Sequence, residues 1–474
     1  MAATPVVEHL DKALLNHKHW DLIFCLDRTK YNERWIVRKR SFTHDLAWTA
    51  SVNIAATLLG LLTGVMLARI LGPEGRGALA AIQNPATILF GVGALGITTA
   101  AAYFSGRDSN LAGCLMTTAL VALLLWSIPL VAIAYLMMPF LLNAQSASVI
   151  HYAQIYLLII PIQFAIGAPF WVLQGLGEFK LWNILRFQAP IAWLVVIGLT
   201  WVLGTLTVEA ISLFYLAAML CVACVFVVLG LRRVPPPHQP EFARLLGLLR
   251  YGLPTSLTTV PQQLNLRLDQ LLMATFLPAD TLGLYVVAVA WSGAFSALLT
   301  SVSQVVFPRL AATHDQHVQA ETLHRTLRLC VLSAAMLAVV LLALTPLVLP
   351  LLFGAAFMSA VPAALVLVVA AGIASFNQVA GEGLRGIGAP KLPMIAEFIG
   401  LGTTVVMLAL LLRRYELMGA AVASLTSYLV TLAALVFLIA RRTQVSPWKV
   451  VIPRHEDLFL LWSQLLSFRR RLVG

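Results

Sequence analysis

The chain has 474 residues, of which 60% are hydrophobic and 11% are charged, and its mean hydropathy is +0.88. Soluble globular domains typically have about 25% charged residues, so this composition excludes an ordinary soluble protein. The net charge of +12 does not indicate nucleic-acid binding, because the basic residues follow the loop pattern of a membrane protein.

Apolar runs repeat along almost the whole chain, and each is long enough to cross a hydrocarbon core of about 30 Å as a helix. The runs are continuous and do not alternate, which argues against a transmembrane β-barrel. We predict an all-α membrane protein with about twelve transmembrane helices in two parallel six-helix lobes around a central cavity. The expected spans are 46–69, 80–103, 112–137, 149–172, 181–203, 207–230, 250–276, 282–306, 327–352, 359–380, 391–412 and 417–440.

The distribution of lysine and arginine predicts the orientation of these spans. With the N-terminus placed inside, the basic residues gather on the inner side, where the cytoplasmic loops of membrane proteins hold them. An even number of spans then places both termini in the cytoplasm. The basic residues outside this pattern are Arg69, Arg76, Arg413 and Arg414 near the outer loops and Arg267 within the membrane.

The chain contains an internal repeat. Leu173 to Ile184 reads LQGLGEFKLWNI, and Leu384 to Ile395 reads LRGIGAPKLPMI, so the two segments align without a gap. Each copy joins the fourth and fifth spans of its half. Because six spans per half is an even number, the halves share one orientation, and such parallel repeats imply a pseudo-two-fold axis along the membrane normal.

The repeat divides the chain into segments. The tail is polar, but its apolar residues between Leu458 and Leu466 recur at helical spacing and precede three arginines, which is typical of a helix at the membrane surface. The expected segments are a cytoplasmic N-terminal extension (1–44), an N-lobe (45–230), a cytoplasmic linker (231–249), a C-lobe (250–440) and a cytoplasmic interfacial tail (441–474).

Span seven carries the densest group of polar residues. An ionised side chain at mid-bilayer costs about 2.5–3.5 kcal/mol, so Arg267 and Asp269 predict a segment that faces protein or water. Gln262, Asn265 and Asp269 share one helical face, whereas Arg267 lies two residues from Asp269 and points nearly the opposite way. We expect at least one of these residues to line a cavity and bind substrate; an ion pair with another helix is the alternative.

Charged residues near the inner ends of the spans suggest a gate. Arg186 and Glu397 occupy equivalent positions of the repeat, each roughly 9 Å into its helix at about 1.5 Å per residue. We hypothesise that they form an ion pair between the lobes; separate local partners are the alternative. Arg385 and Lys391 lie on an inner loop beside Gly381–Gly386, where they either contact phosphate or set the topology. That glycine pattern adjoins apolar helices instead of a strand, so no dinucleotide or other cofactor is expected.

Two motifs resemble a known family. Ala68 to Gly77 (ARILGPEGRG) resembles the opening signature of the polysaccharide-biosynthesis flippases, and Asp269, Leu272 and Gly283–Ala288 (GLYVVA) are similar to the signature of their second half. That family belongs to the multidrug/oligosaccharidyl-lipid/polysaccharide superfamily. The resemblance implies two six-helix lobes that face a central cavity and that open alternately to the two sides of the membrane.

The resemblance also implies a function in the bacterial inner membrane: outward movement of a polyprenyl-linked oligosaccharide. The implied partners are this lipid, the membrane lipids, and a polysaccharide polymerase and glycosyltransferases. Cationic cavity residues hold the pyrophosphate in the family, and by resemblance we assign this role to Arg69, Arg76 and Arg267. Two negative charges that move outward gain about 4.6 kcal/mol per 100 mV, so no ATP is expected to be needed.

Three alternatives stay open. A cation-coupled drug exporter of the same superfamily would normally have acidic residues inside the N-lobe, where only Glu209 occurs, near an outer end. A membrane glycosyltransferase or glycan polymerase would need a larger outer loop with acid and base residues, so an enzyme is not expected. A scaffold that does not transport would keep the same fold.

No metal site is expected, because Cys221 and Cys224 lie inside an apolar helix without further ligands nearby.

Overall fold

The computed structural model describes residues 42–293 and 316–453, and every regular element in these two stretches is a helix. The predicted tail helix and most of the N-terminal extension lie outside the described residues. The first half comprises α3 (Phe42–Gly93), α4 (Ile97–Arg107), η2 (Ser109–Leu111), α5 (Ala112–Leu141), α6 (Ala147–Tyr156), α7 (Ile159–Gly175), α8 (Phe179–Leu185), α9 (Gln188–Val202) and α10 (Val208–Arg233).

The second half begins after a linker that contains the short turn η3 (Phe242–Arg244). Its helices are α11 (Leu245–Leu257), α12 (Val260–Asn265), α13 (Leu268–Phe276), a helix over 279–293, α15 (Gln316–Phe353), η4 (Ala355–Ala360), α16 (Val361–Gly386), α17 (Lys391–Thr443) and α18 (Pro447–Val451).

These helices account for the predicted spans. Eight helical segments of the described part are long and apolar enough to cross a membrane. Two of them contain a sharp kink that divides them into two spans each, α3 at Gly72 (φ 66°) and α17 at Glu416 (φ 43°). Span seven is broken into α11, α12 and α13, and span eight is described only over 279–293. Because two of the eight segments contain two spans each, the eight segments account for ten spans. Span seven and the described part of span eight bring the number to the twelve expected, so the chain is a multi-pass membrane protein.

The surface of the bundle supports this conclusion. Large apolar side chains such as Leu136, Phe140, Trp201 and Leu347 are more than two-thirds exposed. A soluble monomer rarely exposes contiguous apolar surface of this kind. The outward faces of the helices are therefore suited to lipid, whereas the buried core lies between the helices of each lobe.

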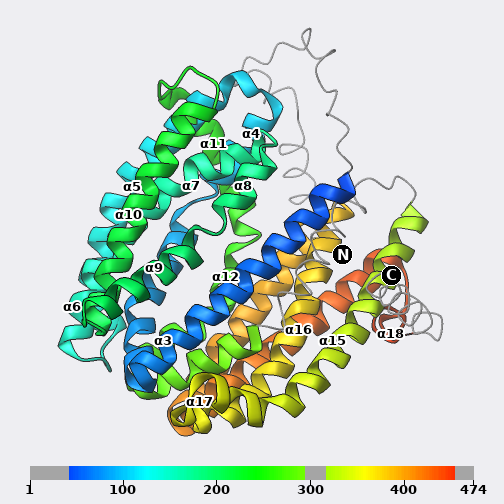
Figure 1. The fold of residues 1–474 in the computed structure, drawn as a ribbon. Helices are drawn as coiled ribbons and strands as arrows, with labels where there is room; N and C mark the ends of the chain where they lie inside the picture. The colour runs from blue at the N-terminus through cyan, green and yellow to red at the C-terminus, as the bar shows by residue number, and fades with distance from the viewer. Residues whose placement is uncertain (1–41, 294–315, 454–474) are drawn as a thin grey trace, which may run out of the picture.

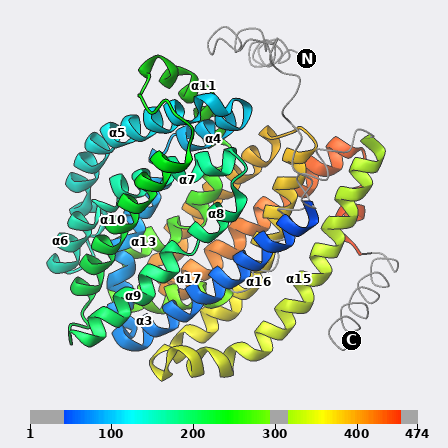
Figure 2. The same cartoon turned by 45° about the horizontal axis from the view of Figure 1, so that its top comes forward.

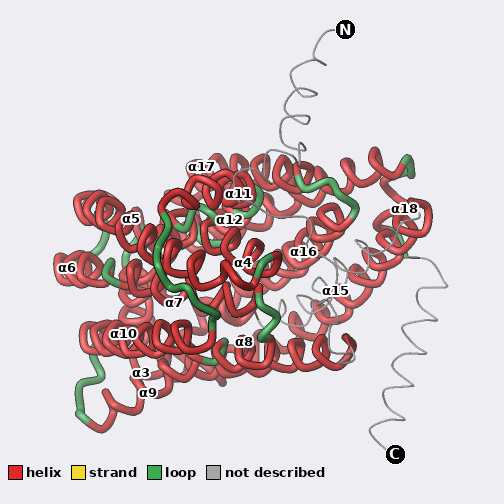
Figure 3. The backbone as a smooth tube through the Cα atoms, turned by 90° about the horizontal axis from the view of Figure 1, so that it is seen from above, coloured by secondary structure: helices red, strands yellow, loops and turns green. Residues whose placement is uncertain are grey.

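The helices form two lobes, with α3 between them (Figures 1 and 2). In the N-lobe α5, α7, α9 and α10 pack together, and in the C-lobe α15, α16 and α17 do so. Helix α3 contacts α6, α9 and α10 on one side and α12, α13 and α15 on the other. Seen from above in Figure 3, α5 and α6 lie at one end of the molecule and α15 and α18 at the other.

The structure repeats the backbone geometry of the duplicated motif residue by residue. Gly177 and Gly388 hold the same position in the two copies, and both have φ of 76°, a left-handed conformation that glycine adopts without strain. The next residue donates its N–H to a carbonyl five positions earlier in both copies, Glu178 to Leu173 at 3.0 Å and Ala389 to Leu384 at 2.9 Å. The gapless match in the sequence is therefore a structural repeat, in which a glycine ends span four and span ten alike.

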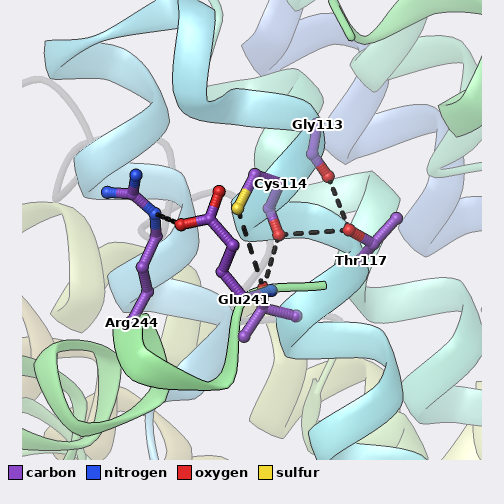
Figure 4. A network of polar contacts seen from close by, with 6 residues as sticks. Gly113, Cys114, Thr117, Glu241 and Arg244 are labelled. Atoms are coloured by element: carbon purple, nitrogen blue, oxygen red, sulfur yellow. Dashed lines mark hydrogen bonds and ion pairs between the residues drawn. The ribbon is translucent and has the colours of Figure 1, made fainter. Parts of the chain in front are cut away.

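The linker is anchored to the N-lobe (Figure 4). The backbone N–H of Glu241 donates to Thr118 Oγ1 at 2.9 Å, and Arg244 Nε lies 2.6 Å from the Glu241 carboxylate, a contact that lowers the pKa of Glu241. A Cβ added to Gly113 would lie 2.3 Å from the Pro235 carbonyl. Glycine at this position therefore allows the linker to cross the start of α5 at backbone distance.

Span seven belongs to both lobes. Its first helix, α11, packs on α4 of the N-lobe, where the Tyr251 and Tyr103 rings stack at 4.4 Å and a Cβ on Gly252 would lie 2.6 Å from the Gly96 carbonyl. Its second and third helices, α12 and α13, pack on α17 of the C-lobe. The breaks between these helices therefore lie at the junction of the two lobes.

The loops of the molecule lie on two sides. The linker side carries the linker and the two repeat loops, which follow even-numbered spans. The far side carries the loops that follow odd-numbered spans, including 142–146 and 277–278.

Candidate substrate-binding site

A pocket of about 270 Å³ lies between spans two and seven, and we call it the inter-lobe pocket. Arg267 stands at the break between α12 and α13, where the chain makes a tight turn with the Arg267 N–H bonded to the Leu264 carbonyl at 3.0 Å. This break leaves the Arg267 side chain exposed to the pocket. The lining residues are Thr87, Ile88, Phe90, Gly91 and Val92 from span two and Gln263, Leu264, Leu266 and Arg267 from span seven.

Arg267 is held by a neutral side chain of the other lobe. Its Nη1 donates to Asn84 Oδ1 at 3.5 Å, and Asn84 Nδ2 donates to Gln270 Oε1 at 2.9 Å. Asn84 and Gln270 are both buried. The amides therefore contact the guanidinium without giving it an ion-pair partner. Asn84 is not among the predicted site residues; the available signal was a pair of adjacent amides, Gln83 and Asn84, in an apolar span.

A second arginine lies on the same helix as Asn84. Arg76 follows the kink at Gly72 in α3, and its Nε is buried without a hydrogen-bond partner. Within the described residues neither guanidinium forms an ion pair with a carboxylate. A buried guanidinium donor without a partner is costly, and the unused planar donors of the two arginines match the oxygens of a phosphate.

Asp269 faces the interior of the C-lobe. Its carboxylate accepts from Tyr285 OH at 2.5 Å, from Ser424 Oγ at 3.1 Å and from the Gln270 N–H at 2.7 Å. These three donors satisfy the buried carboxylate and leave it engaged with its own lobe. As the helical spacing predicted, Arg267 and Asp269 point apart; they attract each other through space but form no ion pair.

A second cavity lies inside the C-lobe, and we call it the C-lobe cavity. It has a volume of about 220 Å³ and lies between spans seven, eight, ten and twelve. Asp269 and Gln262 contribute to its wall. A small adjoining pocket is lined by Gln262, Asn265, Asn377 and Glu397. The walls of these two spaces contain carboxylates, whereas the wall of the inter-lobe pocket contains a guanidinium.

Asn265 is fixed inside the C-lobe by hydroxyl groups. Its Oδ1 accepts from Thr404 and, at 3.2 Å, from Ser427. Ser427 also donates to the Gly400 carbonyl at 2.9 Å. Glu397 is buried beside Asn265. Asn265 therefore links span seven to spans eleven and twelve and lies outside the inter-lobe pocket.

The structure places the third predicted phosphate ligand elsewhere. Arg69 donates through Nε to the Leu352 carbonyl at 2.7 Å and through Nη2 to the Leu351 carbonyl at 2.5 Å. These carbonyls belong to the last turn of α15 on the far side. Its donors are therefore occupied by the C-lobe backbone in this conformation, which leaves Arg76 and Arg267 as the two predicted phosphate ligands whose donors are not used in this way.

The predicted gate residues do not meet in this conformation. The Arg186 guanidinium lies over the Trp182 ring at 4.8 Å, and Arg186 and Glu397 form no ion pair with each other. Arg385 pairs with Glu382 at 2.5 Å and donates to the Thr258 carbonyl at 3.2 Å, next to the break between α11 and α12. Lys391 is exposed at the start of α17. The Arg186–Glu397 gate therefore stays a hypothesis about another conformation.

The fold defines a class of protein. The chain has the two-lobe fold of the transporters of the MOP superfamily, whose solved members align over most of its length. One is described as "Lipid II flippase MurJ, inward closed conformation", with TM-score 0.70 and 16% identity over 88% of this chain and 92% of that chain. Another is described as an inward-facing conformation of a multidrug resistance MATE family transporter, with TM-score 0.64 and 16% identity over 84% and 99% of the two chains. A third is the MATE multidrug transporter DinF-BH, with TM-score 0.60 and 16% identity over 85% and 96%.

The family follows from the sequence. The family model described as "Polysaccharide biosynthesis protein" matches residues 42–314, more than half of the chain. The chain therefore belongs to the polysaccharide biosynthesis protein family, as its motifs predicted. No curated protein matches it in sequence.

Proposed function

We propose that this protein is a flippase that moves a polyprenyl-pyrophosphate-linked oligosaccharide from the inner to the outer leaflet for surface polysaccharide synthesis. The observation that carries the proposal is Arg267, an arginine without an ion-pair partner that lines the inter-lobe pocket. Arg76, whose Nε is buried without a hydrogen-bond partner, is the second proposed phosphate ligand. A pyrophosphate supplies the missing anion. The family membership and the likeness to a lipid II flippase support the same choice of substrate.

The physics of the substrate explains why a protein is needed. Each bare hydroxyl costs about 4–8 kcal/mol to enter hydrocarbon on the cyclohexane reference, so an oligosaccharide head cannot cross alone. A polar path between the lobes would carry the head, while the polyprenyl tail stays in lipid. Gln263 and Thr87 add polar groups to the inter-lobe pocket beside Arg267.

The orientation and the energy source are part of the proposal. The linker side is assigned to the cytoplasm, because most of the 32 basic residues lie on that side or in the flanking termini. In a bacterial inner membrane, the potential would then favour outward movement of the doubly charged head by about 4.6 kcal/mol per 100 mV. The glycosyltransferases that build the head and the polymerase that consumes it are the proposed partners.

One observation favours a second function. The C-lobe cavity places the carboxylates of Asp269 and Glu397 in or beside a buried polar space, which suits a cation-coupled multidrug exporter. The same residues are compatible with a flippase that uses a cation gradient. The difference lies in the cargo: a cationic drug would be repelled by Arg76 and Arg267, whereas a pyrophosphate would be attracted.

The test uses the full chain in proteoliposomes. A labelled polyprenyl-pyrophosphate oligosaccharide is placed in one leaflet, and its transfer is followed with and without a potassium diffusion potential. Transfer is expected for the parent protein and is expected to be lost in Arg76→Gln/Arg267→Gln. The matched control is Arg414→Gln, an exposed arginine on the far side.

Each alternative gives a different result in the same vesicles. Efflux of an organic cation driven by a sodium or proton gradient, without lipid transfer, identifies an exporter. Elongation of the glycan identifies a polymerase, and the absence of all three activities identifies a scaffold. If lipid transfer occurs but does not change when the potential is collapsed, the proposed energy source is wrong.

A further inference from the structure

Side chains on the far side connect the lobes by binding the ends of helices. Gln145 lies in the loop after α5 of the N-lobe and is buried. Its Nε2 donates to the Ala274 carbonyl at 2.8 Å and to the Leu277 carbonyl at 2.9 Å. Both carbonyls lie at the C-terminal end of α13. One N-lobe amide therefore caps a helix of span seven.

Two further contacts follow the same plan. Arg69 of the N-lobe donates to the carbonyls of Leu351 and Leu352 in the last turn of α15. In the reverse direction, Thr275 of α13 donates to the carbonyl of Leu141, the last residue of α5, at 2.7 Å. Three helix ends are thus bound by side chains of the opposite lobe, and all three lie on the far side.

The main chains of the two lobes also touch on this side. A Cβ added to Gly77 would lie 1.6 Å from the Ala279 carbonyl, and one added to Gly283 would lie 1.8 Å from the Pro73 carbonyl. These glycines end the two short segments, 71–77 and 277–283, that loosely echo each other in the two halves. Equivalent glycines of the halves therefore meet where the pseudo-two-fold axis would pass.

The chemistry of helix ends explains why such contacts hold and release. The last four carbonyls of a helix lack partners within it and carry the negative end of the helix dipole, which favours a cation such as Arg69. Each donor exchanges a hydrogen bond to water for one to a carbonyl. Its net contribution to the stability of the closed state is therefore modest, and the contact can break and form again. Thr275 also contacts the Leu271 carbonyl of its own helix at 3.0 Å, so its hydroxyl keeps a partner when the lobes separate.

We propose that Arg69, Gln145 and Thr275 form a far-side latch that holds the lobes closed by capping helix ends across the interface. Opening to the far side requires that these contacts break, together with separation of the glycine pair. The latch does not depend on the identity of the transported substrate. It gives Arg69 a role in closure that differs from the phosphate binding expected from its motif.

The test measures the distance between the lobes on the far side. Spin labels are placed at Ala147→Cys and Met358→Cys, two exposed far-side positions in different lobes, after the five native cysteines are replaced by alanine. Double electron–electron resonance then gives the distance distribution of the full-length protein in nanodiscs. Arg69→Gln and Gln145→Glu are expected to raise the ratio of open to closed populations by about tenfold, since the first removes hydrogen bonds from a charged group and the second leaves buried carbonyls without a donor.

Matched variants distinguish the latch from general damage. Thr275→Val is expected to open the far side by about threefold, as for loss of one neutral hydrogen bond, and Thr275→Ser is expected to restore closure. Gln145→Met removes the amide at similar volume and answers the same question if Gln145→Glu does not fold. Arg414→Gln is expected to leave the distribution unchanged. Unchanged distributions in Arg69→Gln and both Gln145 variants, or equal opening in Arg414→Gln, would overturn the latch.

Discussion

The inter-lobe pocket and the C-lobe cavity are built around residues that are two positions apart in span seven, yet they hold opposite charges. Arg267 faces the inter-lobe pocket and donates to an amide, whereas Asp269 accepts from three donors of its own lobe. The break between α12 and α13 turns successive side chains toward different lobes. A charged side chain without an ion-pair partner in a membrane helix therefore indicates a ligand site. A charged side chain whose hydrogen bonds are all made within the protein indicates a role in structure or in ion coupling.

Removing both proposed phosphate ligands should have the largest effect. A hydrogen bond to a charged group is worth about 1.5–3 kcal/mol, so Arg76→Gln/Arg267→Gln is expected to slow lipid transfer by about 100-fold or more, and each single change by about tenfold. Initial transfer rates in proteoliposomes of matched protein content measure this. Equal rates in the double variant and in Arg414→Gln would remove the arginines from the substrate path.

A single carboxylate added beside Arg267 should give the inter-lobe pocket a negative charge, as in the C-lobe cavity. Asn84→Asp places a negative charge 3.5 Å from Arg267 Nη1 and is expected to reduce lipid transfer by about tenfold, because the arginine then has an internal partner. Asn84→Ala removes the amide without adding charge and is expected to cost less. The idea that Asn84 positions Arg267 fails if Asn84→Ala is as inactive as Asn84→Asp.

Removing the carboxylate of the C-lobe cavity should change stability and not substrate binding. Asp269→Asn is expected to lower the free energy of unfolding by about 1–3 kcal/mol, since it disturbs the contacts with Tyr285 and Ser424, while binding of the pyrophosphate lipid stays unchanged. Thermal unfolding in detergent and equilibrium binding measure the two effects separately. Normal stability with lost binding would show that Asp269 acts in the inter-lobe pocket, contrary to the comparison.

The smallest effect tests the equivalence of the lobes. Gly177→Ala and Gly388→Ala both put a side chain at φ of 76°, and each is expected to destabilise its lobe by about 1–2 kcal/mol. Gly198→Ala is the control, because this glycine has helical φ and open space around its Cβ position. Clearly unequal effects of the first two would mean that the repeat has diverged in its energetics.

The sequence predicted the architecture because its signals are local. Continuous apolar runs predicted the spans, and the gapless repeat predicted the paired loops whose glycines share one φ value. It also predicted that Arg267 and Asp269 point apart, although in the structure a break in the helix at Arg267 contributes to this and not helical spacing alone. It could not show that Arg69 reaches the end of α15 or that Asn84 reaches Arg267, because these contacts join residues 283 and 183 positions apart. The Arg186–Glu397 hypothesis rested on symmetry alone, and symmetry does not fix which conformation is populated.

The central claim is that Arg76 and Arg267 bind the pyrophosphate of a lipid-linked oligosaccharide. Its most direct test is equilibrium binding of a fluorescent polyprenyl-pyrophosphate oligosaccharide to the protein in nanodiscs, with the uncharged polyprenol as reference ligand. The account predicts that Arg76→Gln/Arg267→Gln weakens binding of the pyrophosphate lipid by about 100-fold and leaves binding of the polyprenol unchanged. The same Kd for the pyrophosphate lipid in the parent and the double variant would contradict it.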